Sequence, residues 1–262
     1  MIDIGVNLTN QRFEKDYDDV LKRAKLAGIK HILITATDLT HCQQAIELCQ
    51  KNNKFLSCTA GVHPHDADNV AVNYREQLLA LAQHDSVKAI GECGLDFNRN
   101  FSTPENQIDV FNTQIQLAAQ LNMPLFLHQR DAFDTWFELL TPFLDSVPAM
   151  VSHCFTGNKQ QLKRCLDAGM YIGITGWLCD NKRGQELQEI VSYIPLDRLL
   201  IETDAPFLTP KNIKPKPKSS RNEPSYLTYV VAMLAEKMNG KYSIEQIIQQ
   251  STNNAQQVFN LP

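Results

Sequence analysis

The feature that most constrains the fold is a repeated alternation between short apolar runs and helical patterns. Eight runs, several of them β-branched, recur at intervals of roughly 20 to 35 residues. They occupy residues 2–6, 31–37, 55–62, 88–93, 124–128, 149–153, 170–175 and 199–204. Many are apolar on both faces, which is typical of parallel strands covered by helices. The pattern therefore predicts eight parallel strands with helices between them.

Helix start signals support this alternation. Thr103 is a plausible N-cap, Pro104 suits the first helical position, and apolar residues then recur at helical spacing through residue 121. Ser243 and Gln246 form a capping-box pattern ahead of another apolar series. We expect helices to begin at both places.

Length and composition fit one α/β domain. The chain has 262 residues, close to the roughly 250 typical of a single α/β barrel. Hydrophobic residues make up 43% and charged residues 21%, so a large core can form. We predict a (β/α)8 TIM barrel that spans residues 1–262 as one domain. The alternative is an open doubly wound sheet, but no G-x-G-x-x-G turn follows the first run.

Charge and targeting signals restrict the partners and the location. A net charge of −4 argues against a globally basic nucleic-acid coat, but not against a local basic groove. No apolar run reaches the ~18 residues of a membrane span, and the N-terminus lacks a signal-peptide pattern. The seven cysteines are scattered without C-x-x-C, which indicates reduced thiols. We expect a cytoplasmic monomer.

Polar residues stand where five of the eight runs end: His63, Glu92, His128, His153 and Asp204. In a TIM barrel the active site lies at the C-terminal ends of the strands. A single histidine there is more often structural, but five such residues would converge on one rim. Histidines together with carboxylates are a metal-ligand set, so the sequence predicts a shared metal site.

Six motifs follow one another along the chain: "GVHPHDAD", "AIGECGLDFNR", "PLFLHQRDA", "VSHCFTG", "LLIETDAPFLTP" and "RNEPSYL". This series resembles that of the TatD deoxyribonucleases, which are metal-dependent barrels of the amidohydrolase type. The resemblance implies an Mg²⁺-dependent 3′–5′ exonuclease that acts on single-stranded DNA, with RNA as a further substrate. It also implies a role in DNA repair or degradation.

The resemblance assigns roles to the polar residues. It implies a metal-ligand set of Glu92, His128, His153 and Asp204. Asp204 is implied either as a ligand or as the base that orients the attacking water. His63 and His65 would contact the scissile phosphate or that water, and Glu202 would support the site from a deeper layer.

One departure from the family pattern concerns the metal count. Most of the family opens with D-x-H-x-H, whereas Gly5 and Asn7 stand at the two histidine positions here, after Asp3. We therefore expect one firmly held ion and at most a second, weak one. The resemblance implies Mg²⁺, but two imidazoles also suit Mn²⁺ or Zn²⁺.

The expected substrate contacts are basic and aromatic. Residues 205–224 form a Pro- and Lys-rich loop that could follow a phosphate backbone. The predicted substrate-binding residues are Arg130, Phe207, Lys214, Lys216, Lys218 and Arg221, with Lys211 and Trp177 as further candidates.

Two other functions fit the same residues. A metal-dependent amidohydrolase or aminoacyl-tRNA deacylase could use the same ligand set, although the Lys- and Pro-rich loop favours a polyanionic substrate. A non-catalytic barrel would follow if the site had decayed together with the two missing histidines. The remaining intact ligand set argues against that second alternative.

Overall fold

The computed structural model describes residues 1–262 and contains eight strands. They are β1 (Ile2–Val6), β2 (His31–Ile34), β3 (Leu56–Ala60), β4 (Val87–Asp96), β5 (Leu125–Arg130), β6 (Met150–Ser152), β7 (Tyr171–Ile174) and β8 (Leu199–Ile201). The strands form one sheet in the order β1 to β8, and a parallel bridge pairs Val6 with Ala205 after β8. This confirms the predicted (β/α)8 barrel.

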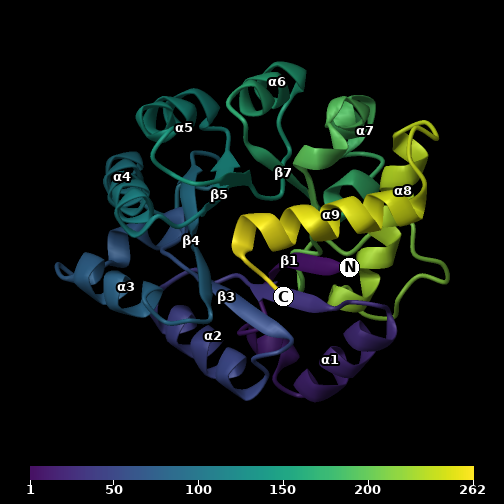
Figure 1. Cartoon of the computed structure of the whole chain (residues 1–262), viewed down its shortest axis with the longest axis horizontal. Helices are drawn as coiled ribbons and strands as arrows, with labels where there is room; N and C mark the ends of the chain where they lie inside the picture. The colour runs from purple at the N-terminus through teal and green to yellow at the C-terminus, as the bar shows by residue number, and fades with distance from the viewer. The chain divides into compact units, whose positions relative to one another are not determined.

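Nine α-helices alternate with these strands or follow the last one (Figure 1). They are α1 (Tyr17–Leu26), α2 (Leu39–Lys51), α3 (Tyr74–Ala82), α4 (Pro104–Leu121), α5 (Phe133–Leu140), α6 (Lys159–Asp167), α7 (Gln185–Ile190), α8 (Leu227–Lys237) and α9 (Ile244–Phe259). None of these helices has the length and apolar character to cross a membrane.

Both predicted helix starts are confirmed. Thr103 Oγ1 accepts a hydrogen bond from the Asn106 amide at 3.4 Å, and Pro104 is the first residue of α4. Ser243 and Gln246 form a reciprocal capping box at the start of α9, with bonds of 3.2 and 2.9 Å. These side chains satisfy amide groups that a helix start leaves without partners.

Contacts within the chain define two compact units, residues 1–33 with 154–262 and residues 34–153. In the second unit β4 and β5 pair in parallel, and their buried side chains include Ile90, Phe126 and Leu127. In the first unit β7 pairs with β8, and Ile172 and Leu200 are fully buried. That the chain is a single domain stays a prediction.

Strand β4 is longer than predicted, because it continues past Gly94 to Asp96. Gly94 has a φ of +148°, and a Cβ there would overlap the carbonyl oxygen of His128. The glycine therefore allows β4 to approach β5 closely rather than forming a turn. The extension makes Glu92 and Asp96 part of one strand, four residues apart.

The predicted position of the polar residues at strand ends needs correction. Glu92 and His128 lie within β4 and β5, not at their ends. His63 is the N-cap of the 3-10 turn η2 (Pro64–Asn69), since Pro64 begins that turn. His153 follows β6 by one residue. Asp204 lies three residues beyond β8 with a φ of +54°, which is incompatible with extended backbone.

Candidate active site

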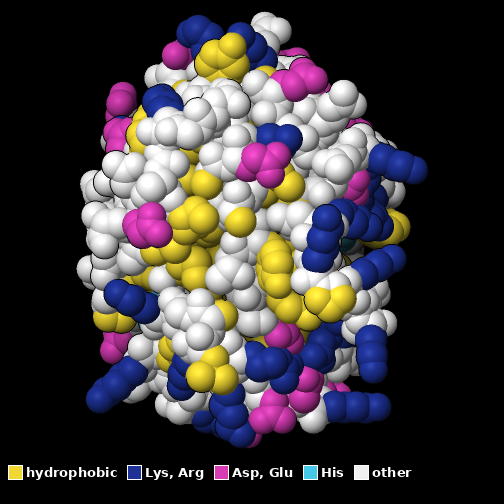
Figure 2. All heavy atoms as spheres, turned by 90° about the vertical axis from the view of Figure 1, so that its right-hand side faces the viewer, with side chains coloured by type: hydrophobic (Ala, Val, Ile, Leu, Met, Phe, Trp, Pro, Cys, Tyr) yellow, Lys and Arg dark blue, Asp and Glu magenta, His cyan; other side chains and the backbone are white.

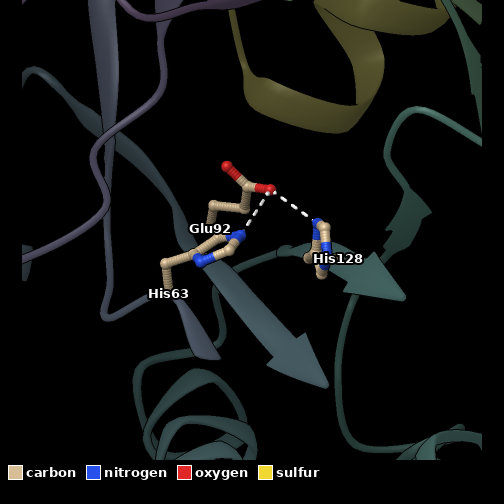
Figure 3. A group of neighbouring side chains, drawn as sticks. All are labelled: His63, Glu92 and His128. Carbon is tan, nitrogen blue, oxygen red and sulfur yellow. Dashed lines mark hydrogen bonds and ion pairs between the residues drawn. The ribbon is translucent and has the colours of Figure 1, made fainter. Parts of the chain in front are cut away.

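Three imidazoles surround one carboxylate oxygen in the unit formed by residues 34–153. Glu92 Oε1 lies 3.0 Å from His128 Nδ1, 3.4 Å from His63 Nε2 and 3.5 Å from His153 Nε2. Figure 3 shows the Glu92 carboxylate between His63 and His128. Glu92, His63 and His153 are buried, so water does not screen their interaction.

These side chains fit a divalent cation. One ligand atom each from His63, Glu92 and His128 lies within 4.8 Å of the others. His128 Nε2 is buried without a hydrogen-bond partner, and the Asp96 carboxylate stands 3.5 Å from it. A buried ring nitrogen left in this state is costly unless a ligand completes it. Imidazole nitrogens and a carboxylate oxygen are ordinary donors to Zn²⁺ and Mn²⁺.

Burial and neighbouring charges set the protonation of the cluster. Burial acting alone would raise the pKa of Glu92, but the imidazoles of His63, His153 and His128 outweigh it and hold this pKa well below its usual range. Burial lowers the pKa of His63 to about 4. At neutral pH Glu92 is therefore ionised and His63 neutral, which are the states that bind metals.

Asp96 was given no role from the sequence, yet it joins two of the site histidines. Its Oδ2 lies 2.7 Å from His65 Nε2 and 3.5 Å from His128 Nε2. Burial favours the neutral form, but the imidazoles of His128 and His65 outweigh it and keep the pKa of Asp96 below its usual range. Period-two alternation from Glu92 along the extended β4 would have identified it.

His63 and His65 lie together, as expected, but for a different reason. The ring centroids are 4.2 Å apart, and those of His63 and His128 are 4.6 Å apart. His63 Nδ1 also accepts a hydrogen bond from the His65 amide at 3.2 Å. The 3-10 turn η2 brings the two histidines together, rather than the alternation of a strand.

In the unit formed by residues 1–33 with 154–262, Glu202 is fully buried. Its Oε1 accepts a hydrogen bond from the Cys154 amide at 2.6 Å. A Cβ at Gly5 would overlap Glu202 Oε2, and one at Gly173 would overlap Oε1. Glycine at position 5, where the family pattern has histidine, therefore leaves the space that the Glu202 carboxylate fills.

Asp204 and Asp3 belong to the same unit as Glu202. Asn7 Nδ2 donates to Asp204 Oδ1 at 3.1 Å, which orients that carboxylate. Asp3 accepts from the Thr203 amide at 2.9 Å and from Thr203 Oγ1 at 2.7 Å. Burial, together with a smaller effect of the Glu202 charge, raises the pKa of Asp3 to about 8 against these hydrogen bonds. The ligand set that joins Asp204 to Glu92 stays a prediction.

The predicted substrate-binding residues differ in what they contact. The loop lysines Lys211, Lys214, Lys216 and Lys218 are all exposed. Figure 2 shows Lys and Arg side chains gathered along one edge of the face that carries α7 and α8. These lysines are the groups of the loop that are available to a polyanion.

The other predicted contacts differ in how strongly they pair with neighbouring residues. Arg221 donates to both carboxylate oxygens of Asp16, at 2.6 and 2.8 Å. Arg130 Nε lies 3.9 Å from Asp131 Oδ1. Phe207 is 48% exposed, and the guanidinium of Arg183 lies 4.5 Å from the centroid of the Trp177 ring. Arg221 thus has a strong internal partner, and its role as a phosphate contact stays a prediction.

Fold and site together define a metal-dependent hydrolase built on a (β/α)8 barrel. A family model described as TatD related DNase matches residues 2–260. The chain belongs to this family, which confirms the resemblance of its six motifs.

Relatives and solved structures agree with this assignment. A protein from Pectobacterium atrosepticum named 3′-5′ ssDNA/RNA exonuclease TatD is 52% identical over 261 residues, covering 100% of both chains. A Salmonella typhimurium protein of the same name is 52% identical over 235 residues, covering 90% of each chain. The crystal structure of a TatD family hydrolase from Entamoeba histolytica matches with a TM-score of 0.89 and 30% identity, covering 99% of this chain and 97% of that one. A TatD homologue from Escherichia coli matches with a TM-score of 0.90 and 27% identity, covering 100% and 98%.

Proposed function

We propose that this protein is a divalent-metal-dependent 3′–5′ exonuclease that hydrolyses phosphodiester bonds of single-stranded DNA and RNA. The observation that carries the proposal is the buried Glu92 carboxylate facing the imidazoles of His63, His128 and His153. A relative that is 52% identical over its full length and carries the name of such an exonuclease supports the choice of substrate.

We assign the metal to Glu92, His128, His153 and Asp204, with Mg²⁺ as the ion in the cell and Mn²⁺ or Zn²⁺ as competent substitutes. A bound divalent ion lowers the pKa of water and balances charge on a phosphate. Because Glu202 fills the space beside Gly5, a second ion would have fewer protein ligands. We therefore propose one firmly bound ion and at most a weak second one.

The chain's own residues would handle the proton and the phosphate. Asp204, oriented by Asn7, would accept the proton of the attacking water. His65, hydrogen-bonded to Asp96, would donate to a phosphate oxygen, and His63 would contact the same phosphate. Glu202 would support the site through the Cys154 amide. General acid–base catalysis of this kind typically contributes about 10²–10⁴-fold.

The loop lysines would bind the rest of the strand. Lys214, Lys216 and Lys218 would follow the phosphate backbone, and Arg130 would contact a phosphate nearer the reaction. Phe207, at 48% exposure, offers a ring on which a base can stack. A monomeric state, a cytoplasmic location and a role in DNA repair or degradation are further parts of the proposal.

The decisive experiment uses metal-stripped protein and single-stranded DNA labelled at its 5′ end. Addition of Mg²⁺ or Mn²⁺ should give a ladder that shortens progressively from the 3′ end, and RNA should behave similarly. Circular single-stranded DNA is the matched control, because it has no end. Efficient cleavage of circles would refute the exonuclease assignment. Hydrolysis of amide or ester substrates instead of DNA would favour an amidohydrolase or a deacylase.

A further inference from the structure

The loop that follows β4 holds an aromatic side chain out in solvent beside the site. Phe101 is 63% exposed, and its ring meets His65 edge-on with centroids 4.7 Å apart. The guanidinium of Arg99 lies 5.9 Å from the centre of the same ring. Single exposed apolar residues are common, but this one adjoins a histidine of the site.

The first half of this loop is fixed by side-chain hydrogen bonds. Asp96 Oδ1 accepts from the amides of Asn98 and Arg99, at 3.0 and 2.8 Å. Asn98 Nδ2 donates to Asp131 Oδ2 at 2.7 Å, and Asn100 Nδ2 donates to the Phe97 carbonyl at 2.9 Å. An exposed turn with this many bonds is ordered before any ligand arrives.

The second half of the loop is fixed by Ser102, which follows Phe101 and whose side chain is buried. Ser102 Oγ donates to the His65 carbonyl at 2.9 Å and accepts from the Asp68 amide at 3.0 Å. Gln107, fully buried, donates from Nε2 to the Ser102 carbonyl at 2.9 Å. The backbone after Phe101 is therefore fixed against the segment that carries His65, and the backbone before it is fixed by Asp96.

Asp96 connects this loop to the site. Its Oδ1 accepts hydrogen bonds from the loop amides, while its Oδ2 lies 2.7 Å from His65 Nε2. The Phe101 ring is the outermost of four neighbouring rings. It is followed by His65, His63 and His128, with successive centroids 4.7, 4.2 and 4.6 Å apart. A preordered aromatic surface loses little conformational entropy when a ligand covers it.

We propose that Phe101 is a platform on which a nucleobase of the single-stranded substrate stacks, close to the cleaved bond, with Arg99 contacting a neighbouring phosphate. The inference rests on the proposed nuclease function and extends it to a residue without an assigned role. Stacking on an aromatic ring is sequence-tolerant, because every base has a π-face. Such a platform would hold a strand end without selecting its bases.

The test compares Phe101→Ala and Phe101→Trp with the wild type. Phe101→Ala should raise KM for oligonucleotides about tenfold and weaken their equilibrium binding similarly, with kcat almost unchanged. Phe101→Trp should restore both values. Tyr193→Ala is the matched control, because Tyr193 is also an exposed aromatic residue, at 55%, and its ring contacts Lys159. It should behave as the wild type.

A second arm separates stacking from simple support of His65. An abasic nucleotide is placed in turn at each of the last four positions of the oligonucleotide. One position should weaken wild-type binding about tenfold and leave Phe101→Ala binding unaffected. A lowered kcat in Phe101→Ala with no position-dependent difference would overturn stacking in favour of support of His65. Unchanged binding in Phe101→Ala would also overturn it.

Cleavage and binding are measured separately, so the two proposals can fail independently. Binding is followed by fluorescence anisotropy of labelled single-stranded DNA without added metal. If the wild type binds DNA more tightly than Phe101→Ala but cleaves nothing in Mg²⁺ or Mn²⁺, the nuclease proposal is refuted and the stacking proposal stands. If the wild type cleaves DNA and Phe101→Ala binds and cleaves it equally well, the stacking proposal is refuted and the nuclease proposal stands.

Discussion

The two compact units carry their polar residues in different states. In residues 34–153, three imidazoles face one carboxylate oxygen, and the buried Nε2 of His128 has no hydrogen-bond partner. In residues 1–33 with 154–262, Glu202 and Asp3 are held by hydrogen bonds from Cys154 and Thr203. The first arrangement is a donor set that suits a divalent cation, and the second is a set of carboxyl groups oriented by hydrogen bonds from the protein.

Within residues 1–33 with 154–262, the basic residues also fall into two groups, one paired with carboxylates and one exposed to solvent. Arg23 and Arg221 share Asp16 and the carboxylate of Glu223, with Arg23 donating to Glu223 at 2.8 to 3.0 Å. The lysines between residues 211 and 218 are exposed instead. Paired arginines therefore stabilise the fold, whereas the exposed lysines remain available for a substrate.

The largest effect should come from the imidazole cluster. His128→Ala or His153→Ala removes a ring that contacts the Glu92 carboxylate. Loss of groups that merely support a metal ligand typically costs 10–100-fold in activity or affinity, so loss of a ligand should cost more than about 100-fold. Activity and Mn²⁺ affinity are measured together, with circular dichroism to check the fold.

His41→Ala is the control for this prediction. His41 lies in the same unit but pairs with Asp38 at the start of α2, so both activity and Mn²⁺ affinity should stay at wild-type values. If His128→Ala keeps wild-type turnover at limiting metal, the ligand assignment is wrong.

Asp96 should matter next, because it orients two histidines without being a proposed ligand. Asp96→Asn keeps the shape but loses a charged acceptor for His65 and His128. We expect kcat to fall about 10–100-fold. Asp85→Asn, at an exposed site in the same unit, should change nothing. Equal kcat in both variants would remove Asp96 from the site.

The sequence predicted more of the fold than of the site. Apolar runs and cap residues located the strands and the starts of α4 and α9, because these signals are local. The predicted strand at residues 88–93 stopped before Gly94, whose role in the close approach of β4 to β5 depends on tertiary packing. Asp96 was overlooked because the predicted strand ended before it.

Several long-range pairings could not be predicted from local patterns in the sequence. The Arg221–Asp16 ion pair joins residues 205 positions apart, and no local pattern marks Asp16 as a partner. The overlap between a side chain at Gly5 and Glu202 likewise depends on the spacing between strands. Such pairings follow from tertiary packing, whereas strands and helix caps follow from neighbouring residues.

Gly5→Ala should test whether the Glu202 carboxylate fills the space beside residue 5. A Cβ at Gly5 overlaps Glu202 Oε2, and overpacking of this kind typically costs about 1–3 kcal/mol. Urea denaturation should show the loss of stability. The double variant Gly5→Ala with Glu202→Ala removes the overlap, so the two effects should not add. Simple additivity would mean that Gly5 and Glu202 do not interact.

The paired arginines predict a smaller effect that depends on pH. Hydrogen bonds from Arg221, followed by those from Arg23, hold the pKa of Asp16 below its usual range despite partial burial. A lowered pKa in the folded state stabilises the protein above the unfolded value of roughly 4, and this stability is lost as pH falls further. Because Arg23 is 40% exposed, we expect about 1 kcal/mol. The difference in urea midpoint between wild type and Asp16→Asn should therefore be present at pH 7 and shrink towards pH 2. A difference that grows on acidification would contradict the assignment.

The exposed lysines should give the smallest effect, visible only as a dependence on salt. Each phosphate contact on a single strand contributes about −0.7 to the slope of log K against log salt. Replacing Lys214, Lys216 and Lys218 by alanine should therefore flatten the slope by about 2, so that doubling the salt weakens wild-type binding about fourfold more than that of the variant. The matched control replaces three exposed lysines of equal total charge, Lys15, Lys22 and Lys30. Equal slopes in the two triple variants would mean that net charge alone acts, because both lose three positive charges. A flatter slope only in the loop variant would mean that these lysines contact the phosphates directly.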